Sequence, residues 1–72
     1  MRVISQSGMV DIPYESSVIT CIDGIIRARN GPDTYIMAEY QDPGNAGLAL
    51  HLMRLGNRTN QREYRFFEEI GA

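Results

Sequence analysis

The sequence predicts an α+β fold: a small antiparallel β-sheet of about five to six short strands with one helix packed on one face, in the order β-β-β-β-β-α-β. Two observations carry this prediction. Runs of β-branched residues separated by turn residues fill the first half of the chain, and one stretch of helical apolar spacing follows them. The 72 residues form a single domain, 1–72, because a chain of this length supports only one thin core.

The N-terminal part predicts two short strands. Residues 2–5 and 9–14 have extended character, and the polar, glycine-containing segment 6–8 between them is typical of a turn. Pro13 has no N–H to donate, so the second strand ends there or lies on the edge of a sheet.

The clearest local signal is Asp23-Gly24 between two β-branched runs, residues 18–22 and 25–29. Both turn residues tolerate positive φ, which is the requirement of a two-residue type I′ hairpin. A second turn of Asn, Gly, Pro and Asp leads into a third strand over residues 34–40. The middle of the chain is therefore expected to form an antiparallel meander.

One helix follows the meander. Asp42 is a good N-cap, and Pro43 at the first helical position loses no hydrogen bond. Gly56 is the expected residue just after the helix. The stripe that should face the sheet consists of Ala46, Ala49, Leu50 and Met53. A polar loop over residues 57–61 then leads to a last strand at 62–68.

The predicted strands carry apolar residues on both faces, although one helix covers only one face. The N-terminal hairpin or a second subunit must cover the other, and we expect a two-fold homodimer. It would pair sheet face to sheet face, or join edge strands such as 9–14 or 62–67. The candidate interface residues for face packing are Ile19, Cys21, Ile26, Tyr35, Met37 and Phe67.

The sequence resembles a group of short bacterial proteins. It carries ISQ at 4–6, Gly8 and DIPYE at 11–15, then MAEY at 37–40 before the helix and YRFF at 64–67. Members of that group often lie near phage-related or mobile genes, and the group has no known function. The resemblance therefore implies no activity, ligand or site residue. Its members usually have a helix richer in Lys and Glu than the one expected here.

Charge argues against a protein that coats phosphate backbones. Seven Arg oppose nine acidic residues, giving a net charge of −2 with no Lys. A local alternative remains: Arg27 and Arg29 share one strand face and, next to Tyr35 or Tyr64, would resemble sheets that stack bases. Solvated arginines facing cross-strand carboxylates are the other interpretation.

No catalytic or cofactor site is predicted. Cys21 and His51 are the only cysteine and histidine, too few for an internal disulfide or a zinc site of the usual kind. No apolar run is long enough for a signal peptide or a membrane span, and the unpaired cysteine suits a reducing cytoplasm. We therefore expect a cytoplasmic accessory protein that acts on an unidentified protein partner and self-associates, rather than an enzyme. The alternative is a small nucleic-acid-binding module using Arg27 and Arg29.

Overall fold

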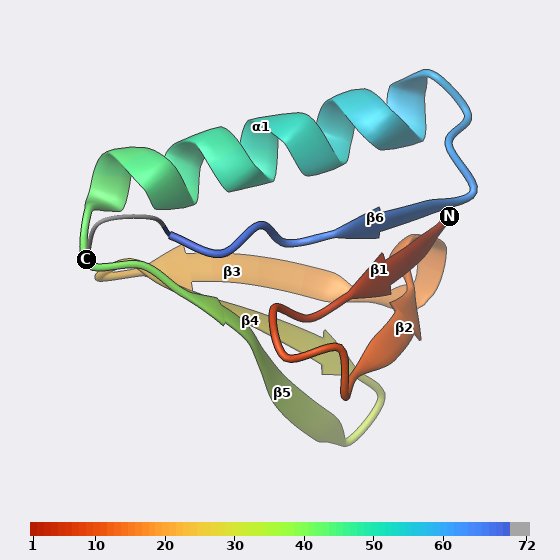
Figure 1. Ribbon diagram of the computed structural model, residues 1–72. Coiled ribbons are helices and arrows are strands. Elements are labelled where there is room, and N and C mark those ends of the chain that lie inside the picture. Colours follow the sequence, from red (N-terminus) through yellow and green to blue (C-terminus); the bar gives the residue numbers. More distant parts are fainter. Residues whose placement is uncertain (70–72) are drawn as a thin grey trace.

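The computed structural model, which describes residues 1–69, confirms the α+β class and the β-β-β-β-β-α-β order (Figure 1). A single 3-10 turn at Tyr14–Ser16 joins the second strand to the third. The elements are β1 (Arg2–Ile4), β2 (Asp11–Pro13), β3 (Val18–Ile22), β4 (Ile25–Asn30), β5 (Asp33–Glu39), α1 (Pro43–Arg58) and β6 (Glu63–Arg65).

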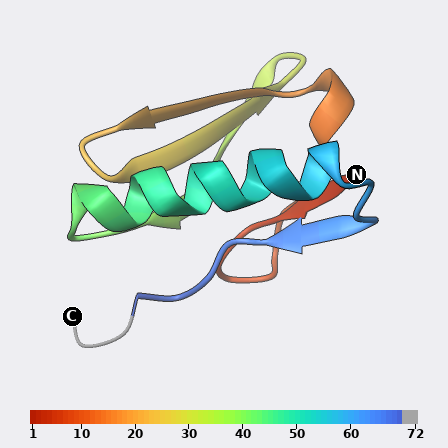
Figure 2. The same ribbon diagram turned by 90° about the horizontal axis from the view of Figure 1, so that it is seen from above.

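The strands form two three-stranded sheets rather than one continuous sheet. The orders are β2-β1-β6 and β3-β4-β5. β1 is antiparallel to β2 but parallel to β6, with Arg2 opposite Glu63 and Ile4 opposite Arg65. The N-terminal hairpin therefore does not extend the meander. Seen from above, α1 runs between β3 and β4 on one side and β1 and β6 on the other (Figure 2).

One core fills the space between the two sheets and the helix. It draws residues from α1 and from every strand except β3 and β6, and its largest members, such as Phe66, are fully buried. The N-terminal hairpin thus covers the inner face of the meander together with α1, which is one of the two coverings that the sequence allows. The buried apolar residues are Val3, Ile12, Ile26, Ala28, Met37, Ala38, Tyr40, Ala46, Ala49, Met53 and Phe66.

The turn between β3 and β4 has the predicted geometry. Asp23 and Gly24 have φ values of 53° and 77°, as a type I′ turn requires. Tyr40 donates its backbone N–H to the carbonyl of Gly24 at 2.8 Å. A side chain at position 24 would overlap the Tyr40 carbonyl oxygen. Glycine is therefore required here both by the turn and by the return of the chain after β5.

The start of α1 is confirmed, and its end differs from the prediction. The Asp42 side chain accepts a hydrogen bond from the N–H of Gly44 at 2.9 Å, and Pro43 is the first helical residue. The helix continues through Gly56 to Arg58, and the left-handed residue is Asn60, with φ 62°. A Cβ on Gly56 would lie 2.6 Å from Oε1 of Gln61, so this glycine permits a close approach instead of ending the helix.

Candidate interaction surface

Two of the predicted interface residues are buried within the chain itself. Ile26 is 0% exposed and Met37 is 1% exposed, because the N-terminal hairpin and α1 cover the inner face of the meander. A bulge also places Met37 there: Ile26 pairs with Ala38 and Arg27 with Ile36, which leaves Met37 as the extra residue. The predicted face-to-face interface is therefore wrong at Ile26 and Met37, because neither side chain is exposed to a second copy.

The other four predicted residues lie in different surroundings. Ile19, Tyr35 and Phe67 are partly buried and pack against the core. Phe67 follows β6, and its ring lies 5.1 Å from that of Tyr40 between centroids. Cys21 is exposed. Of these four residues, only Ile19 and Cys21 therefore lie on the same strand. That strand is β3, which forms one edge of its sheet.

The sheet β2-β1-β6 has two short, charged edges. β2 is three residues long, ends in Pro13, and carries Asp11, whose Oδ1 lies 2.7 Å from Nε of Arg2. β6 is also three residues long, with exposed Glu63 and Arg65. Short strands, proline and charge all discourage the addition of another strand.

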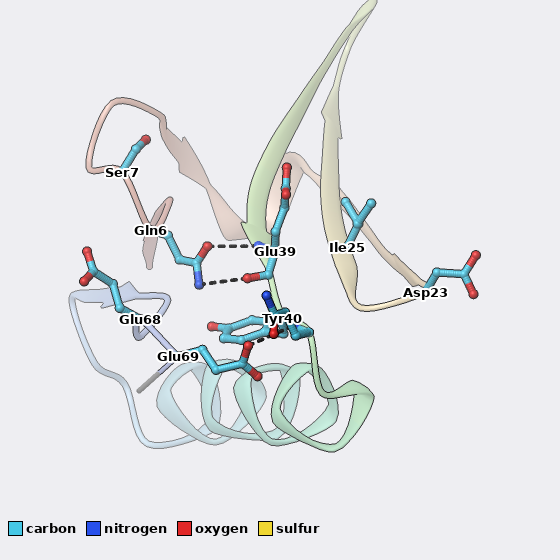
Figure 3. Close-up of a pocket in the computed structure, with 9 residues that line it drawn as sticks. Gln6, Ser7, Asp23, Ile25, Glu39, Tyr40, Glu68 and Glu69 are labelled. Atoms are coloured by element: carbon cyan, nitrogen blue, oxygen red, sulfur yellow. Dashed lines mark hydrogen bonds between the residues drawn. The ribbon is translucent and has the colours of Figure 1, made fainter. Parts of the chain in front are cut away.

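The edge of the other sheet at β5 is covered by Gln6. Its backbone N–H donates to the carbonyl of Met37 at 2.8 Å, and its Oε1 accepts from the N–H of Glu39 at 2.9 Å. Nε2 of Gln6 donates to the carbonyls of Glu39, at 3.3 Å, and Phe67, at 3.0 Å. Figure 3 shows the Gln6 amide facing Glu39. The end of β5 is thus already bonded to the N-terminal segment.

The edge at β3 has none of these protections. Val18–Ile22 is five residues long, and contains neither charge nor proline. Val18 and Ile22 are 51% and 62% exposed. Since Ile22 and Ile25 flank a two-residue turn and exchange hydrogen bonds, the backbone groups of Ile19 and Cys21 point away from β4. These groups have no hydrogen-bond partner within residues 1–69.

The sequence contains a signal for this edge that our prediction missed. The segments containing β2, β4, β5 and β6 each carry at least one charged residue, and VITCI at 18–22 carries none. That contrast gains meaning only when the strand order makes β3 an edge, because an uncharged strand is ordinary in the centre of a sheet.

The arginine and tyrosine residues of the nucleic-acid alternative do not interleave. Arg27 and Arg29 share the outer face of β4, as predicted, but Tyr35 is paired with Ala28 on the inner face. Tyr64 donates its hydroxyl to the carbonyl of Ala49 at 3.0 Å, and burial raises its pKa to about 12. Neither tyrosine presents its ring beside the two arginines.

A shallow acidic concavity of about 700 Å³ lies beside Gln6 (Figure 3). One carboxylate of this concavity already has partners within the chain. Glu69 accepts hydrogen bonds from Nδ2 of Asn45 and from the N–H groups of Gln41 and Asp42. The hydrogen bond from Asn45 contributes most to lowering the pKa of Glu69. The lining residues are Gln6, Ser7, Asp23, Ile25, Glu39, Tyr40, Gln41, Glu68 and Glu69.

The described residues include no cluster of three or more side chains suited to hold a metal ion. Residues 1–69 also contain no helix that is long and apolar enough to cross a membrane. Comparison with protein-family models, with curated proteins and with solved structures gives no match.

Proposed function

We propose that this chain is an interaction protein that acts through a protein–protein surface, and that its first partner is a second copy of itself joined along β3. The observation that carries the proposal is the contrast between edges. β2, β5 and β6 are shortened, charged or covered, whereas β3 is uncharged and open. Protein sheets usually block their edges unless another strand is to be added.

The register of such a dimer follows from the backbone of β3. Two antiparallel copies overlap over all five residues when Thr20 lies on the two-fold axis opposite Thr20 of the second copy. Ile19 then lies opposite Cys21 of the second copy, so the outward N–H and C=O groups of both residues find partners. Val18 meets Ile22 of the second copy, and their exposed side chains cover each other.

The expected affinity is modest. Each new hydrogen bond contributes about 0.5–1.5 kcal/mol, and each cross-strand pair about 0.2–1 kcal/mol. The loss of translational and rotational freedom on association offsets much of this gain. The dimer should therefore dissociate on dilution and re-form at higher concentration. In this register the two Cys21 thiols do not meet, so the proposed dimer needs no disulfide and works in a reducing cytoplasm.

The first test is the mass in solution, measured by light scattering coupled to size exclusion over a range of concentrations. The wild-type mass should approach twice 8.1 kDa as concentration rises, and the melting temperature should rise with it. Thr20→Lys places two lysines together on the axis and should give a folded monomer. Thr34→Lys is the matched control, because Thr34 is an exposed threonine on the opposite edge strand of the same sheet. A mass of 8.1 kDa at every concentration would overturn the proposal.

The second test is the register. Thr20→Cys in a Cys21→Ser background should form a covalent dimer under mild oxidation. The two Cα atoms of a non-hydrogen-bonded antiparallel pair lie about 4.5 Å apart, within the range of a disulfide. Cys21 in the otherwise unchanged protein should cross-link far more slowly. Faster cross-linking through Cys21 would contradict this register.

A further inference from the structure

The outer face of β3-β4-β5 also carries a pair of arginines beside a depression. This arrangement lies within one chain and does not depend on self-association. Arg27 and Arg29 are two residues apart on β4 and project from this face, about 7 Å apart along the strand. Thr20 of β3 lies opposite Arg27, and Thr34 of β5 lies opposite Arg29. The two guanidinium groups are therefore flanked by hydroxyl groups at diagonal corners.

These four side chains line a concave site. Together with Val18 they surround a depression of about 280 Å³ on the face turned away from α1. Val18 lies opposite Arg29 and supplies one apolar wall. A depression that places two forked cationic donors and two hydroxyl groups around one space has the form of an anion site.

The charges at this depression are not satisfied by the chain. Neither Arg27 nor Arg29 forms an ion pair within residues 1–69, and no carboxylate lines the depression. Glu39 is on the same face, opposite Ile25 on the next rung, but makes no ion pair with Arg27. The Thr20 and Thr34 hydroxyls likewise have no protein hydrogen-bond partner in the described part of the chain.

Two of the other five arginines are engaged within residues 1–69. Arg2 is held by Asp11, and Arg65 donates Nη2 to the carbonyl of Gln6 at 3.0 Å. Guanidinium groups without an ion pair or hydrogen bond also occur at Arg54, Arg58 and Arg62 within residues 1–69, so the distinguishing feature is their placement. At Arg27 and Arg29 two of them project from alternate positions of one strand into one depression.

We propose that this depression binds a phosphate group. A phosphate offers oxygens in tetrahedral directions, so it can accept from both guanidinium groups and also from the Thr34 hydroxyl, which lies opposite Arg29. A carboxylate has two oxygens in one plane and leaves some of these donors unused. The phosphate belongs either to a monoester or to the diester backbone of a nucleic acid, and the chemistry at the arginines is the same for both.

The test follows the side-chain Nε–Hε signals of the arginines by NMR while inorganic phosphate is added at constant ionic strength. The Arg27 and Arg29 signals should shift and saturate, and chloride at the same ionic strength should not reproduce the shifts. Arg27→Gln should weaken binding about tenfold, the loss of one charge-assisted contact worth about 1.4 kcal/mol. Arg54→Gln, on the exposed face of α1, should leave binding unchanged.

Three further probes separate the possible ligands. Phenyl phosphate represents monoesters, a short single-stranded oligonucleotide represents diesters, and acetate represents carboxylates. Tighter, strongly salt-dependent binding of the oligonucleotide would assign the site to nucleic acid, and preference for phenyl phosphate would assign it to monoesters. Acetate binding as tight as phosphate would overturn the proposal, as would wild-type affinity in the Arg27→Gln/Arg29→Gln double variant.

Measuring both phosphate binding and the mass in solution of the same variants distinguishes the phosphate proposal from the dimer proposal. Thr34→Val removes one hydroxyl from the depression but leaves β3 unchanged, so it should weaken phosphate binding without altering the mass in solution. Cys21→Pro removes an outward N–H of β3 and leaves every residue of the depression unchanged, so it should give the monomer and still bind phosphate. Loss of phosphate binding in every monomeric variant would show that the site requires the dimer and would contradict a site built within one chain.

Discussion

The two sheets of this domain are held in different ways. The sheet β2-β1-β6 joins segments from the two ends of the sequence, and side chains brace it: Arg2 with Asp11, and Arg65 with the carbonyl of Gln6. The sheet β3-β4-β5 is a continuous meander held by its backbone ladder, with exposed apolar side chains on its outer face and an open edge. The first sheet therefore closes the core, whereas the second leaves backbone groups of β3 and the side chains of Arg27 and Arg29 without partners in residues 1–69.

The largest expected effect tests the closing role of the first sheet. Phe66 follows β6, is 1% exposed, and meets the ring of Tyr64 edge-on at 5.2 Å between centroids. Phe66→Ala should lower the free energy of unfolding by about 3–5 kcal/mol, measured in urea. Ile36→Ala, on the outer face of the meander, should cost far less because Ile36 is 51% exposed. Equal losses of stability in the two variants would contradict the closing role of the first sheet.

The next effect concerns the joint between the two sheets. Gln6→Ala removes the amide that bonds to both backbone groups of Glu39 and to the carbonyl of Phe67. The loss should be about 1–3 kcal/mol, since polar groups at a half-buried joint lose their partner. Hydrogen exchange at the Glu39 amide should accelerate at the same time. Gln41→Ala is the control, because the Gln41 side chain makes no hydrogen bond to residues 1–69; a similar loss there would rule out a specific role for Gln6.

A smaller effect is expected at the start of α1. Asp42→Ala removes the cap on the Gly44 N–H and should lower the free energy of unfolding by about 0.5–2 kcal/mol. Asp42→Asn keeps an accepting oxygen and should recover most of the loss. If Asn and Ala variants are equally unstable, the negative charge rather than the hydrogen bond stabilises the helix start.

The smallest effect is a dependence on pH. Hydrogen bonds from Asn45, Gln41 and Asp42 lower the pKa of Glu69 below its ordinary value of 4.5. A carboxylate with a lowered pKa stabilises the folded state above 4.5, and this contribution is lost as pH falls through the lowered pKa. Thermal unfolding of Glu69→Gln should therefore converge with that of the wild type in acid. A constant difference at all pH values would contradict this assignment.

Local chemistry made the turns and the helix start predictable. Asp23-Gly24 specifies a type I′ turn through two adjacent residues, and Asp42-Pro43 specifies a helix start in the same way. Gly56 misled the prediction because a glycine ends a helix only when its φ becomes positive. Here the glycine stays helical and admits the side chain of Gln61.

Tertiary pairing was not predictable from such signals. Nothing near residues 2–4 indicates a parallel partner at residues 63–65, and without that pairing the division into two sheets does not emerge. The same lack of information on tertiary pairing explains why the interface prediction was wrong at Ile26 and Met37. Ile26 and Met37 are apolar on a strand face, and sequence alone does not say whether the chain's own hairpin or a second copy covers that face.

The parallel pairing of β1 with β6 also affects the order of events during folding. The meander and the β1–β2 hairpin need only neighbours in sequence, whereas the pairing of β1 with residues 63–65 joins distant parts of the chain and is expected to close last. In the interval the inner face of the meander, with Ile26 and Met37, lacks part of its cover, while the open edge of β3 is already formed. A refolding chain therefore passes through a stage in which an uncharged strand edge and a partly uncovered apolar face are exposed together, and refolding should be most prone to association at this stage.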